Sequence, residues 1–449
     1  MLQHDPIVRT RAGAVRGVRD DFGHLYRAIP YTAAPVGRAR FAAPAPPADW
    51  KDVRDATQPS PTAPQPTRNF GRLNMFPYFG PGWVRGEDYL TVDVRTPASD
   101  DAARPVMVFV HGGGFVTGST RGGLYDGRAF ARDGVVLVTL NYRLGIPGFL
   151  DLDDAPANRG LLDVLAALAW VRDNVAAFGG DPANVTVFGQ SAGATLIGAL
   201  LATPDAKRLF RRAIMQSGNG TGAFTPEQAQ RVTQAASASL GVQPTAEAFG
   251  EISDEGFLEI LPKLAGLDLR TETAADPLVG LSPFSLVLPV QPADSLARGP
   301  AADVDLLIGT NTEEGNLYVV PQGNFDDSTD ADELRSAALG DALFGAGTAR
   351  MAKAHSRTSH GRTYVYRFGY RSTALEGKLG AAHTVELPFV FDIADEPWLH
   401  GPTGLLGPDE APSGLSTRMH GAWITFARTG NPGWAAHDLI DDDTVETFN

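Results

Sequence analysis

The chain has 449 residues, of which 43% are hydrophobic and 20% are charged, as is usual for a globular protein with a large core. Its formal net charge of −14 argues against a nucleic-acid partner and against docking on an anionic membrane, and the lack of cysteine excludes disulfides, thiolate catalysis and cysteine-bound metals. No apolar run is long enough to span a membrane, and the amino-terminal residues lack the pattern of a secretory leader, so we expect a cytoplasmic protein without a membrane span.

The amino-terminal part of the chain predicts short strands followed by an irregular segment. Residues 7–20 have the pattern of short strands. Residues 30–66 are too rich in proline for regular structure, although Phe41 and Trp50 are apolar anchors within them. We therefore expect residues 30–66 to wrap over the surface of the main body rather than to link two domains.

From residue 105 onward, apolar runs that predict buried strands alternate with helical segments. Such alternation is typical of a largely parallel sheet with helices on both faces, so we expect one α/β domain over residues 1–449. Residues 218 to about 300 interrupt the alternation and predict a helical insertion over the carboxyl edge of the sheet. The strands are expected at residues 105–110, 135–140, 185–188, 213–216, 305–309 and 363–368, and the main helices at residues 161–175, 192–201 and 416–428.

The motif Gly189-Gln190-Ser191-Ala192-Gly193 is the most informative short segment of the chain. It has the G-x-S-x-G pattern of a nucleophile elbow, in which a serine is held on a sharp turn between a strand and a helix. Side chains at Gly189 and Gly193 would collide with the backbone, and the turn presents the N–H of Ala192 to a developing oxyanion. An ordinary turn between strand and helix can also carry this pattern, but the apolar runs on both sides favour a nucleophilic Ser191.

A second glycine-rich segment, His111-Gly112-Gly113-Gly114-Phe115, follows a predicted strand directly. Its consecutive glycines allow the N–H groups of Gly113 and Gly114 to point at a substrate oxygen, whereas the alternative is a flexible turn. A phosphate-binding loop is disfavoured because the Gly-Lys-Ser/Thr ending is absent. We expect His111 to have a structural role.

The acid and the base of a serine triad should follow Ser191 in the order acid, then histidine. Glu313 and Glu314 lie just beyond the predicted strand at 305–309, and spacing alone does not choose between them. Among the later histidines, His383 lies in a loop-like stretch and is favoured by context. His420 is expected to pack within a helix, and the remaining candidates are His355 and His360, which are expected to be exposed, with His400 and His437.

Longer segments along most of the chain match a known family. They include IPYTAAPVGRARFAAPAPPADW, GEDYLTVDV, HGGGF, NYRLGIPGF, the block from NRGLLD to GQSAGA, MQSG, EEG and HTVELPFVF. On these residues the chain resembles the bacterial-like type-B carboxylesterases of the carboxylesterase/cholinesterase family, which implies an α/β-hydrolase fold. The resemblance implies Ser191 as nucleophile, Glu314 as acid, His383 as base, and an oxyanion hole formed by Gly113, Gly114 and Ala192.

The resemblance also shapes the expected function. It implies a serine carboxylic-ester hydrolase that passes through an acyl-enzyme on Ser191, acts on a small-molecule ester and needs neither a metal nor an organic cofactor. Phe115 is expected to line the substrate site, and Ser217 is expected to lie near the triad as a structural hydroxyl. Many relatives carry a disulfide that this cysteine-free chain lacks. The alternatives are a non-catalytic binding module on the same fold, or an amidase or acyltransferase with the same residues, and the oligomeric state stays open.

Overall fold

The computed structural model describes residues 5–203, 206–299, 303–323, 330–358, 360–437 and 444–449. Residues 1–4, on which the expectation about a leader partly rests, lie outside this description. Within it, no helix combines the length and the apolar character needed to cross a bilayer.

A ten-stranded sheet forms the centre of the molecule, with the strand order β13-β12-β11-β10-β9-β7-β8-β6-β4-β3. The strands from β13 to β8 pair in parallel, and β6, β4 and β3 extend the sheet in antiparallel fashion. A separate three-stranded sheet has the order β1-β2-β5. The strands are β1 Ile7–Arg9, β2 Ala14–Arg16, β3 Val18–Asp20, β4 Gly23–Pro30, β5 Arg54–Asp55, β6 Thr91–Thr96, β7 Arg104–Val110, β8 Val136–Leu140, β9 Gly180–Gln190, β10 Arg212–Gln216, β11 Asp305–Asn311, β12 Thr363–Phe368 and β13 Val445–Phe448.

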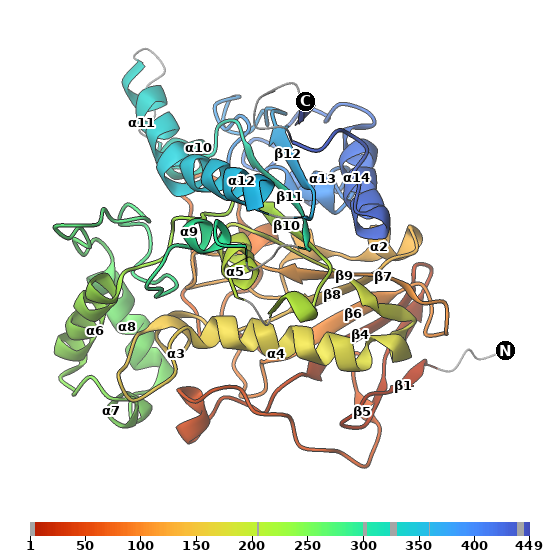
Figure 1. Ribbon diagram of the computed structural model, residues 1–449, viewed down its shortest axis with the longest axis horizontal. Coiled ribbons are helices and arrows are strands. Elements are labelled where there is room, and N and C mark those ends of the chain that lie inside the picture. The colour runs from red at the N-terminus through yellow and green to blue at the C-terminus, as the bar shows by residue number, and fades with distance from the viewer. Residues whose placement is uncertain (1–4, 204–205, 300–302, 324–329, 359, 438–443) are drawn as a thin grey trace.

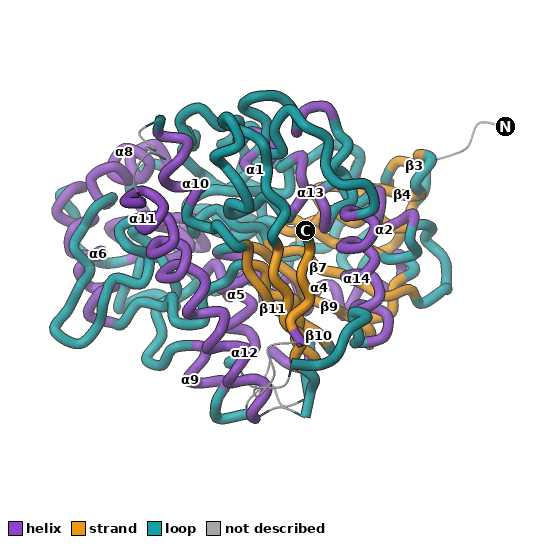
Figure 2. Tube along the Cα trace, turned by 90° about the horizontal axis from the view of Figure 1, so that it is seen from above, coloured by secondary structure: helices purple, strands orange, loops and turns teal. Residues whose placement is uncertain are grey.

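Helices cover both faces of this sheet (Figure 1). Seen from above, α5 and α12 lie on one side of the central strands, and α2 and α14 lie on the other (Figure 2). The α-helices are α1 Phe76–Phe79, α2 Arg128–Arg132, α3 Gly145–Phe149, α4 Arg159–Asn174, α5 Ala192–Leu201, α6 Pro226–Leu240, α7 Ala246–Gly250, α8 Asp254–Leu264, α9 Pro292–Leu296, α10 Asn316–Val319, α11 Asp330–Gly340, α12 Ala346–Thr358, α13 Leu387–Val390 and α14 Leu415–Thr429, and a π-helical turn, η6 Asp341–Gly345, precedes α12.

The strand β7 shows why the sheet is buried on both sides. Val106, Val108 and Val110 belong to the core cluster on the α4 and α5 face, whereas Met107 and Phe109 belong to the cluster on the α2 and α14 face. Successive side chains of a strand point to opposite faces, so a continuous apolar run is required where helices cover both. The apolar run at residues 105–110 is therefore explained by its place in the sheet.

The observed elements confirm the expected largely parallel α/β architecture. The predicted strands are found as β7 to β12, and β9 begins earlier than expected because Gly180 pairs with Arg104. In the region predicted as a helical insertion, α6, α7 and α8 lie at one end of the molecule (Figure 1). Within the proline-rich segment, Phe41 is buried and Trp50 is partly buried.

The parallel strands bring the sequence motifs to one edge of the sheet. The triple-glycine segment follows β7, the elbow follows β9, and Glu313 and Glu314 follow β11. His383 lies after β12, just before α13. Ligand sites in such sheets form at the carboxyl ends of the strands, which is where these segments lie.

Candidate functional site

Ser191 occupies a strained turn between β9 and α5. Its φ of 57° and ψ of −126° are unfavourable for a residue with a side chain, and a backbone hydrogen bond from its N–H to the Gln216 carbonyl, 2.9 Å long, holds the turn. A Cβ on Gly193 would lie 2.0 Å from the Val110 carbonyl oxygen, and a Cβ on Gly189 would lie 2.6 Å from the same atom. Only glycine therefore allows β7 to pack this close to the elbow.

The triple-glycine segment forms a tight loop against the elbow. Gly113 and Gly114 both have positive φ, and a Cβ on Gly113 would lie 2.0 Å from the Thr117 carbonyl oxygen. In the described part of the chain, no acceptor takes the N–H of Gly113 or Gly114, and Ala192 is the first residue of α5, where helical N–H groups lack partners. These N–H groups are available for a substrate oxygen.

A buried acid–base pair lies at the same edge of the sheet. His383 Nδ1 is 2.6 Å from Glu314 Oε2, and both side chains are almost completely buried. The other carboxylate oxygen, Oε1, accepts hydrogen bonds from the Ser217 hydroxyl at 2.5 Å and from the Asn311 N–H at 2.7 Å. Because Glu314 requires a proton on Nδ1, it leaves Nε2 of His383 as the acceptor nitrogen.

Glu313, the other candidate acid, points away from this pair. Its carboxylate makes an ion pair with Arg371 and accepts the N–H of Ala381 at 2.9 Å, and its side chain is 25% exposed. The structure thus brings Glu314, and not Glu313, to His383.

The imidazole of His383 is fixed by further contacts that sequence reasoning missed. Phe344 stacks on the ring with 4.1 Å between the centroids, and Gln190 Nε2 lies 3.2 Å from His383 Nε2. Tyr78 donates its hydroxyl to Gln190 Oε1 at 2.9 Å. The described residues show no hydrogen bond between Ser191 and His383, and catalytic hydrogen bonds often shorten only when substrate binds.

A second buried carboxylate, Glu386, lies behind the pair. It accepts hydrogen bonds from Asn311 Nδ2 at 2.8 Å and from Gln216 Nε2 at 3.3 Å. Burial, together with the nearby Glu314 carboxylate, raises the pKa of Glu386 to about 7. Glu386 lies in the HTVELPFVF segment, and no local pattern there predicts that its side chain is buried.

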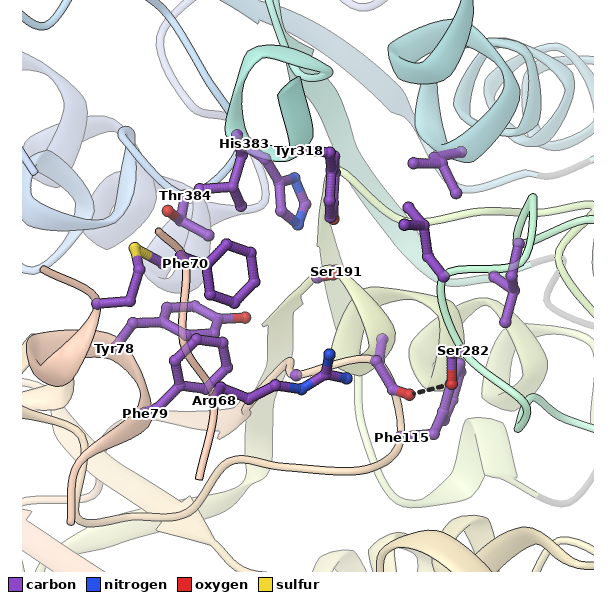
Figure 3. Close-up of a pocket in the computed structure, with 18 of the residues that line it drawn as sticks. Arg68, Phe70, Tyr78, Phe79, Phe115, Ser191, Ser282, Tyr318, His383 and Thr384 are labelled. Carbon is purple, nitrogen blue, oxygen red and sulfur yellow. Dashed lines mark hydrogen bonds between the residues drawn. The ribbon is translucent and has the colours of Figure 1, made fainter. Parts of the chain in front are cut away.

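Ser191 and His383 line a cavity of about 240 Å³ (Figure 3). Phe115 lies in its wall and packs edge-on against Phe149. The cavity wall is otherwise largely aromatic and aliphatic, and much of it was not anticipated, although residues 68–83 are visibly rich in aromatic side chains. The apolar and aromatic wall residues that the sequence did not indicate are Phe70, Met75, Tyr78, Phe79, Leu278, Leu281, Leu317, Tyr318, Leu343 and Phe344. Arg68 is a charged residue of the wall that the sequence also did not indicate.

Several of the other histidines are buried in the protein interior. His111 is buried, stacks on Tyr142 with 4.4 Å between the centroids, and has its pKa lowered to about 4 by burial. His420 is buried in α14 with Nδ1 2.7 Å from the Val390 carbonyl oxygen, and His360 is exposed. The expectation for His355 was wrong: this side chain is fully buried and bonds to Thr363, because its face of α12 packs on β12.

In the part of the chain that the structure describes, no group of three or more His, Asp and Glu side chains is arranged so that it could hold a metal ion.

Known proteins resemble this chain over nearly its whole length. A family model described as the carboxylesterase family matches residues 4–334 and 321–440. The chain is similar to the para-nitrobenzyl esterase of Bacillus subtilis (strain 168), at 38% identity over 98% of this chain and 94% of that protein. It is also similar to the phenmedipham hydrolase of Pseudarthrobacter oxydans, at 34% identity over 97% of this chain and 92% of that protein. A solved PNB esterase structure matches with a TM-score of 0.85 at 35% identity, covering 99% of this chain and 96% of that one.

Proposed function

The chain belongs to the carboxylesterase family, and from this premise we propose that it hydrolyses carboxylic esters through an acyl-enzyme on Ser191, with His383 as general base and Glu314 as the acid of the triad. The observation that carries the proposal is the buried His383–Glu314 pair, 2.6 Å apart, in a cavity wall that also contains Ser191. A serine hydroxyl needs such a base to become a nucleophile.

The first half of the reaction forms the acyl-enzyme. Ser191 Oγ attacks the ester carbonyl carbon while its proton passes to Nε2 of His383, and Glu314 stabilises the imidazolium that results. The oxygen of the tetrahedral intermediate receives the N–H groups of Gly113, Gly114 and Ala192. The intermediate then collapses: the bond to the alcohol oxygen breaks, and this oxygen takes the proton from His383 as the alcohol leaves.

The second half releases the acid. Water attacks the acyl carbon as His383 removes one of its protons, and the new tetrahedral intermediate uses the same N–H groups. The bond from the carbon to Ser191 Oγ then breaks, and Oγ regains its proton from His383. All of these steps use groups of this chain, the ester and water.

A covalent probe tests the proposal. A fluorophosphonate should label the protein, peptide mapping should locate the label on Ser191 and not on Ser282, the other serine of the cavity wall, and short p-nitrophenyl esters should be cleaved. Ser191→Ala should lose both the label and the turnover. A binding module on the same fold predicts a folded protein with no turnover, so that result, or labelling that persists in Ser191→Ala, would refute the proposal.

A further inference from the structure

Arg68 is a cation without a protein partner in the cavity of the proposed active site. Its Nε is buried and has no hydrogen-bond partner, and in the described part of the chain no hydrogen bond or salt bridge reaches its guanidinium. Burial lowers the pKa of Arg68 from its ordinary value, but a guanidinium stays protonated in proteins. The charge is therefore present and uncompensated.

Two arginines that are completely buried in this chain have their donors satisfied by the protein. Arg143 forms a buried salt bridge with Asp163, with Nη2 and Nε 2.7 Å and 2.9 Å from its two carboxylate oxygens. Arg159 donates to several backbone carbonyl groups, among them those of Pro147 and Leu150. Arg68 is only partly buried, but its Nε lacks a partner and no protein group accepts from its guanidinium in the described part of the chain. Because unpaired donors of a partly desolvated charge are costly, we infer that a ligand group in the cavity completes them.

The composition of the cavity wall defines the charge of that group. Among the described residues that line the cavity, Arg68 and His383 are the basic side chains, and there is no aspartate or glutamate, although the chain has 52 acidic residues. The wall thus carries the guanidinium of Arg68 and no carboxylate within a protein whose net charge is −14, and the Glu314 carboxylate lies behind His383. An anion that enters would meet no carboxylate of the wall.

Arg68 reaches toward the loop that is proposed to bind the oxyanion. Its side chain crosses the cavity toward Ser282, whose hydroxyl donates to the Gly114 carbonyl at 2.7 Å (Figure 3). A Cβ built on Gly114 would lie 3.7 Å from Arg68 Nη2. If the ester carbonyl of a substrate lies at this loop, the substrate atoms that are a few bonds from the carbonyl lie next to the guanidinium of Arg68.

We propose that Arg68 binds a carboxylate of the substrate, so that the preferred substrates are esters carrying a free carboxylate a few carbons from the ester group. This inference rests on the proposed function and names its substrate class. A guanidinium fits a carboxylate through two parallel N–H donors, which makes it the suitable side chain for such a group. The nearby phenols and phenyl rings pack against the carbon chain between the two groups.

Matched esters test the proposal in the full-length protein. Monomethyl glutarate carries the carboxylate on the acyl side and 4-acetoxybutanoate carries it on the alcohol side, and methyl pentanoate and butyl acetate are their neutral counterparts. Hydrolysis is followed by pH-stat titration. In the wild type, kcat/KM for at least one anionic ester should exceed that of its neutral counterpart. The ester that shows this preference tells whether Arg68 binds a carboxylate on the acyl side or on the alcohol side of the ester bond.

Arg68→Met should lower the ratio of anionic to neutral kcat/KM by about 10- to 100-fold, as expected for the loss of a hydrogen-bonded charge pair. Arg68→Lys should retain part of the preference. Arg72→Met is the matched control, because Arg72 stands on the same segment but is exposed and pairs with Glu376 at 3.0 Å. This control should leave the ratio unchanged.

A binding measurement separates this proposal from the proposed reaction. Free glutarate should protect Ser191 from the fluorophosphonate in the wild type and in Arg72→Met, and less so in Arg68→Met. If neutral esters are hydrolysed and Ser191 is labelled, but Arg68→Met lowers kcat/KM for neutral and anionic esters equally, the substrate class is refuted and the ester hydrolase stands. If folded wild-type protein hydrolyses none of the esters and resists the label, the proposed function itself fails.

Discussion

Replacing Glu314 by glutamine should abolish most turnover, for a reason that the hydrogen bonds around it define. In the wild type, Oε1 accepts the Ser217 hydroxyl and the Asn311 N–H, while Oε2 lies 2.6 Å from His383 Nδ1. The two donors will hold the amide oxygen of the glutamine at the Oε1 position. Its NH₂ group must then face Nδ1 of His383.

This amide forces the imidazole into the wrong tautomer. Nδ1 becomes the acceptor, so the proton moves to Nε2, which can no longer take the proton of Ser191. The equivalent acid-to-amide change in serine proteases lowers kcat by about 10⁴-fold. We expect kcat to fall by about 10³- to 10⁴-fold in Glu314→Gln, or roughly 4 to 5.5 kcal/mol of transition-state stabilisation.

Glu313→Gln is the matched control, since it makes the same chemical change one residue earlier in the chain. Glu313 makes an ion pair with Arg371 near the surface, and such pairs contribute about 1 kcal/mol or less. Turnover of a p-nitrophenyl ester should stay within about threefold of the wild type for this variant. Both variants are compared by kcat, with thermal unfolding as the check on folding. Equal losses in the two variants, or a Glu314→Gln enzyme with more than a tenth of wild-type kcat, would refute the tautomer argument.

Two further predictions concern the packing and titration around the site. Gly193→Ala should lower the free energy of unfolding by roughly 3 kcal/mol or more, because its Cβ would meet the Val110 carbonyl oxygen of β7 at 2.0 Å. Gly198→Ala on the same helix faces flexible methionine side chains, so its free energy of unfolding should stay within about 1 kcal/mol of the wild type. Both are measured by urea unfolding, and equal stability of the two variants would contradict this prediction. Glu386 has its pKa raised by burial from 4.5 to about 7, so its contribution is full below its unfolded pKa and is lost as the pH rises through about 7. Glu386→Gln stays uncharged, so the stability of the wild type relative to this variant should fall by roughly 2 to 3 kcal/mol between pH 5 and pH 8, and a difference that does not change with pH would contradict the shifted titration.

The sequence by itself determined the elements that carry the site. The apolar run before the triple glycine and the apolar run before the elbow predicted buried strands, and these are β7 and β9. Such patterns are local, because a strand covered on both faces must be apolar along its length. The glycines of the elbow likewise predicted a close approach of two backbone segments, and the structure leaves no space for a side chain at Gly193.

Which polar groups meet was decided by the tertiary structure. Spacing left Glu313 and Glu314 open, and the family resemblance pointed to Glu314; the packing of β11 beside β12 turns one carboxylate inward to His383 and the other toward Arg371. The sequence also gave no reason to expect a buried Glu386, because its burial depends on β10, β11 and the segment after β12 converging.

Arg68 shows the same limit most clearly. In the sequence it is one arginine in an acidic chain, far from the glycines of the proposed oxyanion loop. Only the fold carries its segment across the carboxyl ends of the strands, where the guanidinium enters the cavity beside Gly114. Local patterns specify which residues are buried in a strand or helix, but charges that meet across a cavity depend on strand order and on the course of the loops, which only the folded chain defines.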